Sequence, residues 1–429
     1  MRTPKTLIHR EASEGTDISS LRQQFPALAQ KLNGKPVAFL DGAGGTQAPQ
    51  RVIDAMSAFW AHGNSNIGGK FPVTERVGRE VESARAALAD LFNAPSPDEI
   101  SFGQNMTSIT FALSRALARE WKEGDNIILT KLDHDANVSP WLAAAEEKGV
   151  EVRWVDAKEE DCTLDMATLD GALSSRTRLV AVTAAANSTG TIPDMWRISK
   201  AARSVGAFTF ADAVHYVPHC LTDVKKMDVD LLSCSAYKFF GPHVGILWGK
   251  RDLLESIGAY KVRPAPATLP WKWETGTQNL EGIVGTEAAV EYLADIGRKM
   301  GGARGSRREA LERAYELMGE HERTLSKRFL DGVEDIKGLR VHGITDRKRL
   351  KERTPTFAVE LDGHAAPEVA EALGREGIFV WSGHYYAIEV MKRLGVIDRG
   401  GLTRVSFVHY NTEEEGARVV ETLGRVANG

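Results

Sequence analysis

From about residue 35 to 250, short apolar runs rich in β-branched residues alternate with longer stretches, several of which have the spacing of an amphipathic helix. The runs that we expect to form strands are 99–102, 126–130, 150–155, 179–184, 208–211, 231–235 and 245–248. Parallel strands need long crossover connections, which are usually helices, so this alternation predicts an α/β chain with a doubly wound, mostly parallel sheet. Ligands of such sheets lie at the carboxyl ends of the strands, so the residues that follow each run are the candidates for function.

The pattern changes after residue 296, where the regular alternation stops. A strand is expected at 356–361, a helix at 367–374, a strand at 378–381, a helix at 385–394, a strand at 402–407 and then a final helix. This order predicts a smaller α+β domain. With 429 residues the chain is long enough for two domains, which we place at 36–296 and at 1–35 together with 297–429. The first 15 residues are expected to be loose.

Charge and hydropathy exclude several classes of function. The chain has 54 Lys and Arg against 58 Asp and Glu, a net charge of −4, which is too balanced for a nucleic-acid or anionic-membrane surface. Basic residues crowd 298–308 and 346–353, where solvated helix faces or loops explain them better than a nucleic-acid patch. No run approaches 18 apolar residues and the first residues lack a signal peptide, so we expect a cytoplasmic protein that binds no membrane.

Cysteine and histidine spacing predicts no metal site and no disulfide framework. The three cysteines are Cys162, Cys220 and Cys234, and their spacing fits no zinc site. His215 and His219 have the spacing of metal ligands on a helix, but Pro218 between them disfavours a regular helical turn.

Polar residues of four kinds follow the expected strands. Asp212 follows 208–211 and Lys238 follows 231–235; either alone is also explained as a helix cap or an exposed side chain. After 99–102, the small polar loop 103–108 leads into a helix, which is the geometry that binds phosphate through backbone N–H groups. His134 comes shortly after 126–130. All four features are expected at the same edge of the sheet.

Together these groups fit pyridoxal phosphate (PLP). A lysine amine forms its Schiff base, a carboxylate keeps its pyridine nitrogen protonated, and an imidazole lies flat against its ring. Nucleotide cofactors are not supported, because the chain has neither a Walker loop nor a G-x-G-x-x-G motif after a strand.

Eight sequence blocks resemble the aminotransferase class V family, and within it the cysteine desulfurase-like group, over most of the chain from Phe39 to Thr412. The blocks are LDGAGGTQ (40–47), DHDANVSPW (133–141), NSTGT (187–191), DAVH (212–215), SAYK (235–238), WETGT (273–277), RVS (404–406) and HYNT (409–412). Each block is modest alone, but their order and spacing make the set specific. The resemblance implies a fold-type-I PLP-dependent transferase fold.

For the cofactor, the resemblance implies that Lys238 carries the Schiff base and acts as general base, that Asp212 pairs with the pyridine nitrogen, and that His134 stacks on the ring. The remaining cofactor-binding residues that it implies are Met106, Thr107 and Ser235 at the phosphate, Asn187 at the ring hydroxyl or the substrate, and His215 where many desulfurases carry Gln. Tyr237 replaces the usual His before the lysine, and its role stays open.

For the substrate, the resemblance implies that Arg404 binds the α-carboxylate in a fork, beside the backbone of Ala43 and Gly44. Asn187 and Tyr386 complete the expected substrate contacts. Gly276 and Thr277 are expected to reach the phosphate of a partner subunit, which implies a homodimer with active sites at the subunit interface.

The chain departs from the desulfurase pattern where a nucleophilic Cys takes up the substrate sulfur. Tyr386 occupies that position, and Trp381 replaces the basic residue usually found five positions earlier. A phenol cannot form a persulfide. Five aromatic residues are as well explained by a wide aromatic-lined pocket near the cofactor as by ordinary core packing: Trp271, Trp273, Trp381, Tyr385 and Tyr386. Of these, Trp381, Tyr385 and Tyr386 are expected to shape a pocket for the distal group of the substrate.

We therefore expect a PLP-dependent enzyme that cleaves the C–S bond of cysteine or an S-conjugated cysteine without an enzyme persulfide. Racemisation or epimerisation, transamination, and decarboxylation or elimination on a natural-product amino acid are alternatives on the same scaffold. A non-catalytic PLP-fold binding partner is the alternative from another class. The sequence does not identify the substrate or the bond that breaks.

Overall fold

The large sheet of the computed structural model, which describes residues 18–429, has seven strands in the order β4-β10-β9-β8-β7-β5-β6. Its strands are β4 (Ile100–Gly103), β5 (Asn126–Thr130), β6 (Glu151–Val155), β7 (Thr177–Thr183), β8 (Phe208–Asp212), β9 (Leu231–Ser235) and β10 (Gly245–Gly249). All seven predicted runs form these strands. Pairing is parallel from β6 to β9, whereas β10 runs antiparallel to both of its neighbours. The α/β class with a mostly parallel sheet is confirmed.

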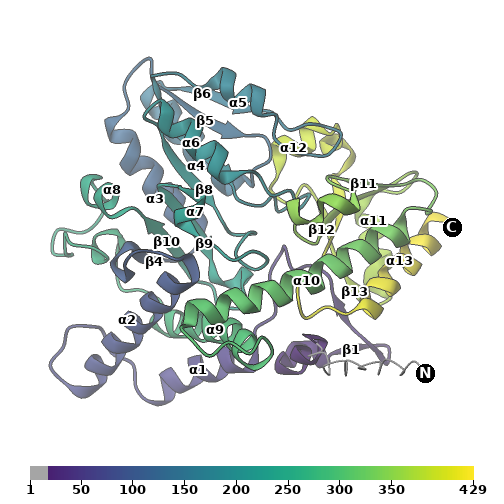
Figure 1. Cartoon of the computed structure of the whole chain (residues 1–429), viewed down its shortest axis with the longest axis horizontal. Coiled ribbons are helices and arrows are strands. Elements are labelled where there is room, and N and C mark those ends of the chain that lie inside the picture. Colours follow the sequence, from purple (N-terminus) through teal and green to yellow (C-terminus); the bar gives the residue numbers. More distant parts are fainter. Residues whose placement is uncertain (1–17) are drawn as a thin grey trace, which may run out of the picture.

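Helices cover both faces of this sheet (Figure 1). They are α1 (Gln50–Ala61), α2 (Pro72–Phe92), α3 (Met106–Leu117), α4 (Ser139–Lys148), α5 (Met166–Ala172), α6 (Met195–Ser204), α7 (Val224–Met227), α8 (Arg251–Ser256) and α9 (Leu280–Lys299). Because side chains alternate along a strand, Ile127 and Leu129 of β5 pack with α3 and α4, while Ile128 joins the core under α2, α6 and α9. Both faces of the sheet are therefore buried, as a parallel sheet requires.

A second, antiparallel sheet of four strands forms the C-terminal part, in the order β11-β12-β15-β14. Its elements are β11 (Leu339–His342), β12 (Thr356–Leu361), β14 (Trp381–Gly383) and β15 (Leu402–Ser406), with α11 (Ala366–Arg375), α12 (Ile388–Arg393) and α13 (Glu413–Ala427). The long helix α10 (Arg307–Val333) runs toward this sheet from α9 (Figure 1).

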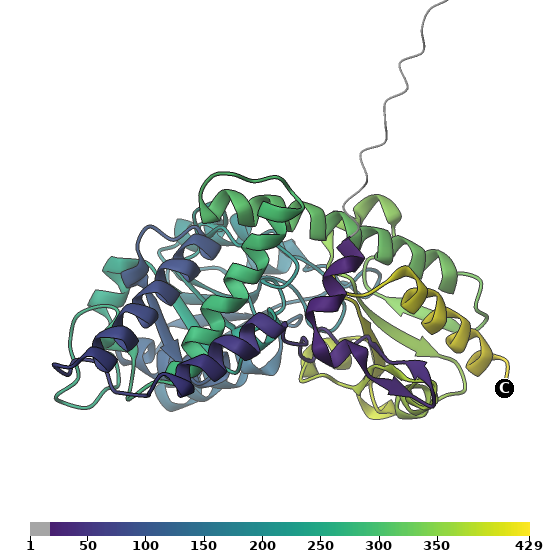
Figure 2. The same ribbon diagram turned by 90° about the horizontal axis from the view of Figure 1, so that it is seen from below.

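The N-terminal segment lies beside this C-terminal part (Figure 2). Short strands β1 (Lys31–Leu32) and β2 (Lys35–Pro36) pair with each other, and β3 (Ala38–Phe39) pairs in parallel with β13 (Ile378–Phe379). Short 3-10 helices complete the described chain: η1 (Ile18–Gln24), η2 (Pro26–Ala29), η3 (Pro97–Glu99), η4 (Ala118–Glu120), η5 (Asp135–Asn137), η6 (Ala236–Lys238), η7 (Trp271–Trp273), η8 (Arg347–Glu352) and η9 (Ile397–Arg399). The expectation for the first 15 residues lies outside the described range, and the two-domain boundaries stay a prediction.

The C-terminal part differs from the sequence expectation in three places. The expected strand 378–381 is split between β13 and β14, which belong to different sheets. The helix expected from residue 385 begins only at Ile388, because Tyr385 and Tyr386 have φ angles of 52° and 57° in the left-handed region. Strand β11 was not anticipated.

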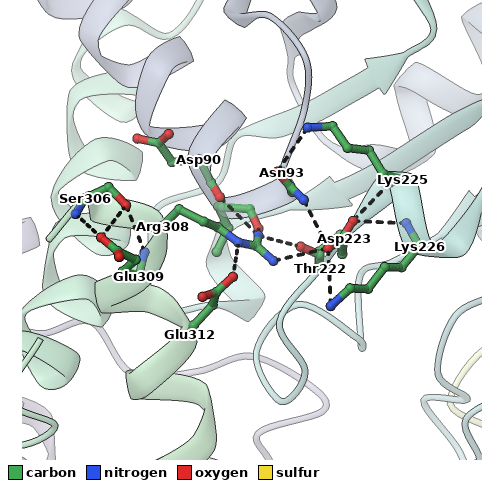
Figure 3. Close-up of polar contacts among 11 residues, drawn as sticks. Asp90, Asn93, Thr222, Asp223, Lys225, Lys226, Ser306, Arg308, Glu309 and Glu312 are labelled. Carbon is green, nitrogen blue, oxygen red and sulfur yellow. Dashed lines mark hydrogen bonds and ion pairs between the residues drawn. The ribbon is translucent and has the colours of Figure 1, made fainter.

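The basic clusters have local ion-pair partners. Arg308, at the start of α10, donates to the carbonyls of Asp90, Leu91 and Thr222 and pairs with Glu312 at 3.2 Å (Figure 3). It also lies 3.6 Å from Asp223. In the second cluster, the partners are likewise acidic side chains: Arg347 pairs with Asp331 and Glu334, and Arg349 pairs with Asp161 and Glu352. These contacts tie α10 and η8 to neighbouring elements.

Among residues 18–429, the helices lack the combination of length and apolar composition that crossing a bilayer needs.

Candidate active site

A cavity of about 600 Å³ lies where β5, β7, β8 and β9 end, between the large sheet and the residues of β14 and β15. Its wall contains twelve of the site residues named from the sequence: Ala43, Gly44, Met106, Thr107, His134, Asn187, Asp212, His215, Ser235, Lys238, Tyr386 and Arg404. The topology therefore brings together residues that lie up to 361 positions apart, from Ala43 to Arg404. Their individual roles stay predictions.

Lys238 ends η6, directly after β9, and its side chain is buried. Its Nζ donates to the carbonyl oxygens of Ala43 and Gly44, the latter at 2.9 Å. Burial, and then the positive charge of Arg404, lowers the pKa of Lys238 to about 7. A substantial fraction of the amine is thus neutral at physiological pH, which suits both nucleophilic attack on a carbonyl and proton transfer.

Asp212 is the last residue of β8 and lies buried in the floor of the cavity. Its Oδ1 accepts a hydrogen bond from the Val214 N–H at 2.9 Å. Burial raises the pKa of Asp212 to about 6, an effect only partly offset by that hydrogen bond and by Lys238. A carboxylate in this setting is stabilised by a cationic N–H donor in the cavity.

His134 caps η5, and its Nδ1 accepts the Ala136 N–H at 3.0 Å. Burial, followed by the charges of Lys238 and Arg404, lowers the pKa of His134 to about 3, so the imidazole is neutral and Nε2 carries the proton. The segment is held by Asn137, which donates to Asp133 at 2.7 Å and accepts from the Trp141 indole at 2.9 Å.

The start of α3 forms one end of the cavity. Asn105 caps this helix, with its Oδ1 accepting the Ser108 N–H at 2.9 Å. The Met106 N–H donates to Ser235 Oγ at 2.9 Å, which joins the helix start to the end of β9. Thr107 is exposed in the first turn, at the positive end of the helix dipole. This arrangement suits a phosphate group.

Tyr237 and His243, whose roles the sequence left open or did not suggest, form the adjacent wall. Their rings stack at 4.8 Å with an interplanar angle of 14°, and Lys238 Nζ lies 5.0 Å from the Tyr237 ring centroid. Nothing in the sequence around His243 pointed to the cavity.

Arg404, in the middle of β15, is buried and held from three sides. It pairs with Asp41 at 2.8 Å, donates to the Asn187 carbonyl at 3.2 Å, and lies 4.7 Å above the Tyr385 ring. Asp41 follows the β3 segment closely, so the rule of inspecting residues after strands could have assigned it a role. A fixed guanidinium next to Lys238 can bind a carboxylate.

The loop before α12 places two adjacent tyrosines differently. Tyr385 is buried under Arg404, whereas Tyr386 is 64% exposed and stacks on His134 with ring centroids 5.5 Å apart. Their left-handed backbone is held by hydrogen bonds to the two tyrosine carbonyls, from Asn187 Nδ2 to Tyr385 at 2.9 Å and from the Asp135 N–H to Tyr386 at 2.6 Å. The sequence placed Tyr386, but not Tyr385, among the expected substrate contacts, and it did not predict that only Tyr385 is buried.

Gly276 and Thr277 line a different hollow, with Trp271 and Glu274, away from this cavity in the single chain. Their predicted contact with a partner's phosphate stays a prediction.

His215 and His219 bond to separate groups. His215 Nε2 lies 2.9 Å from Thr356 Oγ1, and His219 Nδ1 lies 3.0 Å from Glu322 Oε2. Within the described chain, no three His, Cys, Asp or Glu side chains are grouped so as to hold a metal ion.

The cavity fits PLP. Lys238 offers an amine of lowered pKa, Asp212 a buried carboxylate for the ring nitrogen, His134 a flat neutral imidazole, and the start of α3 with Ser235 a phosphate site. In addition, over residues 18–429, four buried polar atoms of the cavity wall have no hydrogen-bond partner: Asn187 Oδ1, His215 Nδ1, Tyr385 Oη and Arg404 Nε. Polar groups of a bound cofactor or substrate would satisfy such atoms.

The three cysteines lie elsewhere in the chain. Cys234 is buried within β9, Cys162 is buried in the turn after β6, and Cys220 is half-buried. Burial raises the pKa of Cys162 and of Cys220 to about 12 and that of Cys234 well above its usual value. Their thiols therefore stay protonated and are poor nucleophiles.

Comparisons with known proteins agree with this geometry. The family model of aminotransferase class V matches residues 38–419. A cysteine desulfurase of Pectobacterium carotovorum subsp. carotovorum is 33% identical over 95% of this chain and 98% of its own, and one of Salmonella gallinarum is 31% identical over 95% and 98%. The crystal structure of the Escherichia coli cysteine desulfurase CsdA superposes with a TM-score of 0.81 at 26% identity, covering 96% and 98% of the two chains. A cysteine desulfurase from Thermococcus onnurineus has the same fold, with a TM-score of 0.83 at 24% identity over 96% and 98%.

Proposed function

The chain belongs to the aminotransferase class V family and is a PLP-dependent enzyme, and on this premise we propose that it cleaves the Cβ–S bond of cysteine or an S-conjugated cysteine. In this proposal the sulfur leaves without forming a persulfide on the protein. The observation that carries the proposal is the cavity that joins Lys238, Asp212 and Arg404, whereas none of the three cysteines lines it.

PLP, when bound, withdraws electrons from the substrate Cα and so makes bonds at that carbon easier to break. Lys238, Asp212 and His134 would hold its reactive ring, and the start of α3 with Ser235 would hold its phosphate. Each of these groups is fixed by the end of a strand or the first turn of a helix, which keeps the geometry precise enough for catalysis.

Substrate orientation falls to Arg404. Its guanidinium is buried and held by Asp41 and by the Asn187 carbonyl, so it is already arranged to take the α-carboxylate in two hydrogen bonds. Fixing that carboxylate presents the Cα proton to Lys238 Nζ. Lys238 can accept the proton because its pKa is lowered to about 7.

The sulfur then leaves with the electron pair of the Cβ–S bond and takes up a proton. Tyr386 lies beside His134 at the mouth of the cavity and is the proposed donor of that proton. The balanced reaction converts the S-substituted cysteine and water into a thiol, pyruvate and ammonium. It needs no oxidant, reductant or sulfur acceptor on the enzyme.

A homodimer in the cytoplasm is the proposed form of the enzyme. Val262, 59% exposed, and Ile67, 38% exposed, line the hollow that contains Gly276 and Thr277, and Phe71, 50% exposed, follows Ile67 by four residues. A second subunit that covers this face would bury these side chains. Thr277 of one subunit would then lie near the cavity of the other subunit. Sedimentation of the wild type and of Phe71→Asp tests this directly: the variant should dissociate, and a monomeric wild type would contradict the proposal.

The decisive experiment is a product assay on the purified PLP enzyme with cysteine and a panel of S-substituted cysteines. Thiol or sulfide should appear together with stoichiometric pyruvate and ammonia. Exchange of the α-proton for deuterium without loss of sulfur would indicate an epimerase. Formation of a keto acid together with loss of the cofactor absorbance near ~420 nm would indicate an aminotransferase. No turnover and no spectral response to any amino acid would indicate a binding partner rather than an enzyme. A protein persulfide releasable by dithiothreitol would overturn the persulfide-free reaction.

A further inference from the structure

A second hollow, which we name the distal hollow, opens beside the cavity and is bounded by β3, β13 and α11. It has a volume of about 440 Å³ and its apolar lining residues are Phe39, Ala370, Ile378, Phe379, Val380 and Trp381. Asp41 and Trp381 line both the cavity and the distal hollow, so the two spaces are direct neighbours on either side of these side chains. We propose that the preferred substrate is an amino acid whose sulfur bears a bulky, uncharged aryl or alkyl group, which passes Trp381 and occupies the distal hollow. This inference rests on the proposed C–S cleavage.

The position of Trp381 beside the carboxylate site carries the first step. Trp381 of β14 is the direct register partner of Arg404 on β15. Residues directly opposite in an antiparallel pair project on the same face, with Cβ atoms roughly 5 Å apart. An amino acid held at Arg404 by its carboxylate therefore has the indole of Trp381 as a neighbour.

The exposure of Trp381 carries the second step. Its side chain is 56% exposed, although it lies between two hollows and next to a buried strand. Covering an exposed indole removes apolar surface from water. A ligand that packs on Trp381 therefore gains binding free energy from that burial. A flat or branched apolar group of the ligand can pack on the Trp381 indole in this way.

Charge decides what kind of group fits. The ionisable side chain of the distal hollow is Asp41, and it is already paired with Arg404 at 2.8 Å. Among residues 18–429, no Lys or Arg lines this hollow. An anionic group placed there would be desolvated beside a carboxylate without a cation of its own, which is strongly unfavourable. The group is therefore neutral, which excludes conjugates ending in a carboxylate or a phosphate.

Length decides against free cysteine as the preferred substrate. Its side chain ends at the sulfur, one bond beyond Cβ, so it fills none of the distal hollow. Trp381 would then stay exposed during turnover. An S-benzyl or S-alkyl group begins at that sulfur and extends the side chain past Trp381.

Trp381→Ala tests the inference in the PLP-loaded enzyme, with Trp196→Ala as the matched control. Trp196 is 53% exposed on α6 and stacks on Lys200 away from the cavity. We expect Trp381→Ala to lower kcat/KM for S-benzylcysteine by about tenfold or more, and for cysteine less than twofold. Trp196→Ala should change neither. A second variant, Ala370→Trp, should fill the distal hollow and exclude S-benzylcysteine while S-methylcysteine is still used.

A non-scissile analogue separates this inference from the proposed reaction. In 2-amino-5-phenylpentanoate, a methylene replaces the sulfur of S-benzylcysteine, so it binds without C–S cleavage. Its dissociation constant, read from the cofactor absorbance, should rise about tenfold in Trp381→Ala and in Ala370→Trp. That result supports the distal hollow even if no sulfur compound is cleaved, in which case only the proposed reaction fails.

Three results would overturn the inference while leaving C–S cleavage intact. One is a wild type that prefers cysteine to S-benzylcysteine in kcat/KM. Another is an equal effect of Trp381→Ala on both substrates. The third is an Ala370→Trp variant that dissociates into monomers with unchanged affinity for the analogue, because a second subunit, not the substrate, would then cover the distal hollow.

Discussion

The two walls of the cavity are built in different ways. On the side of the large sheet, Lys238, Asp212 and His134 lie at or shortly after the ends of β9, β8 and β5; Lys238 and Asp212 are buried and His134 is partly buried. On the side of the C-terminal sheet, Trp381 and Tyr386 are more than half exposed, and Tyr385 and Tyr386 hold left-handed backbone conformations. Such conformations cost of the order of 1–3 kcal/mol each and are kept only where surrounding contacts enforce them.

This difference separates reaction chemistry from substrate choice. The buried wall shifts the pKa values of its groups, lowering that of Lys238 to about 7 and raising that of Asp212 to about 6, because charged forms are poorly solvated there. The exposed wall offers aromatic area instead. We therefore expect changes in the buried wall to affect the reaction on every substrate, and changes in the exposed wall to affect some substrates more than others.

Replacing Lys238 should have the largest effect. Lys238→Ala removes both the covalent attachment and the general base, so kcat should fall by at least about 10³-fold on all substrates. Borohydride reduction of the wild type followed by peptide mapping should place the pyridoxyl group on Lys238. The exposed Lys148 at the end of α4 provides the control variant Lys148→Ala, which should keep full activity. Labelling of another lysine would contradict the assignment.

Arg404→Ala should have the second-largest effect on activity. The loss of a bidentate contact to the α-carboxylate should weaken substrate binding by about 2–4 kcal/mol, which lowers kcat/KM by roughly 30- to 1000-fold, while the cofactor absorbance persists. Arg404→Lys should recover only part of the loss, because an ammonium group cannot reproduce the fork. If Arg404→Ala turned over amino acids normally, the carboxylate site would move to the backbone around Ala43 and Gly44.

The pH profile should show a smaller, graded effect of the buried wall. The Lys238 amine accepts a proton only in its neutral form, so kcat should fall about tenfold per pH unit below pH 7 and level off above it. Arg404→Gln removes the positive charge that helps to lower the pKa of Lys238, so the ascending limb should move to higher pH. A profile that is flat from pH 5.5 to 8 would show that Lys238 is not the base.

Changes at Tyr386 should have the smallest effect. Tyr386→Phe keeps the ring that stacks on His134 but loses the hydroxyl, so turnover should slow by about tenfold with an unchanged cofactor spectrum. Tyr386→Cys should not by itself form a persulfide during turnover, because the family resemblance predicts Trp381 at the position of the basic residue that accompanies that cysteine. A wild-type rate in Tyr386→Phe would remove Tyr386 from proton transfer.

Much of the fold and of the buried wall could be predicted from the sequence. Each of the seven strands of the large sheet is a short, local run of mostly apolar residues. Because these strands are buried on both faces, they can be recognised from their own sequence without knowing which strands they pair with. Asp212 and Lys238 follow those runs directly, and strand ends of a parallel sheet meet at one edge. In this wall the local sequence pattern agrees with the tertiary position, so the pattern was sufficient to predict that these residues lie together.

The exposed wall was decided by tertiary structure. Tyr385 and Tyr386 are the same residue type at adjacent positions, and only packing under Arg404 buries one and leaves the other over His134. The expected strand at 378–381 is divided because β13 pairs with β3, near the start of the chain, while β14 pairs with β15. Asp41 meets Arg404 across 363 positions of sequence. Contacts between distant segments leave no periodic signal in either segment. The charge and shape of this wall therefore could not be predicted from the sequence pattern and are set by the tertiary structure.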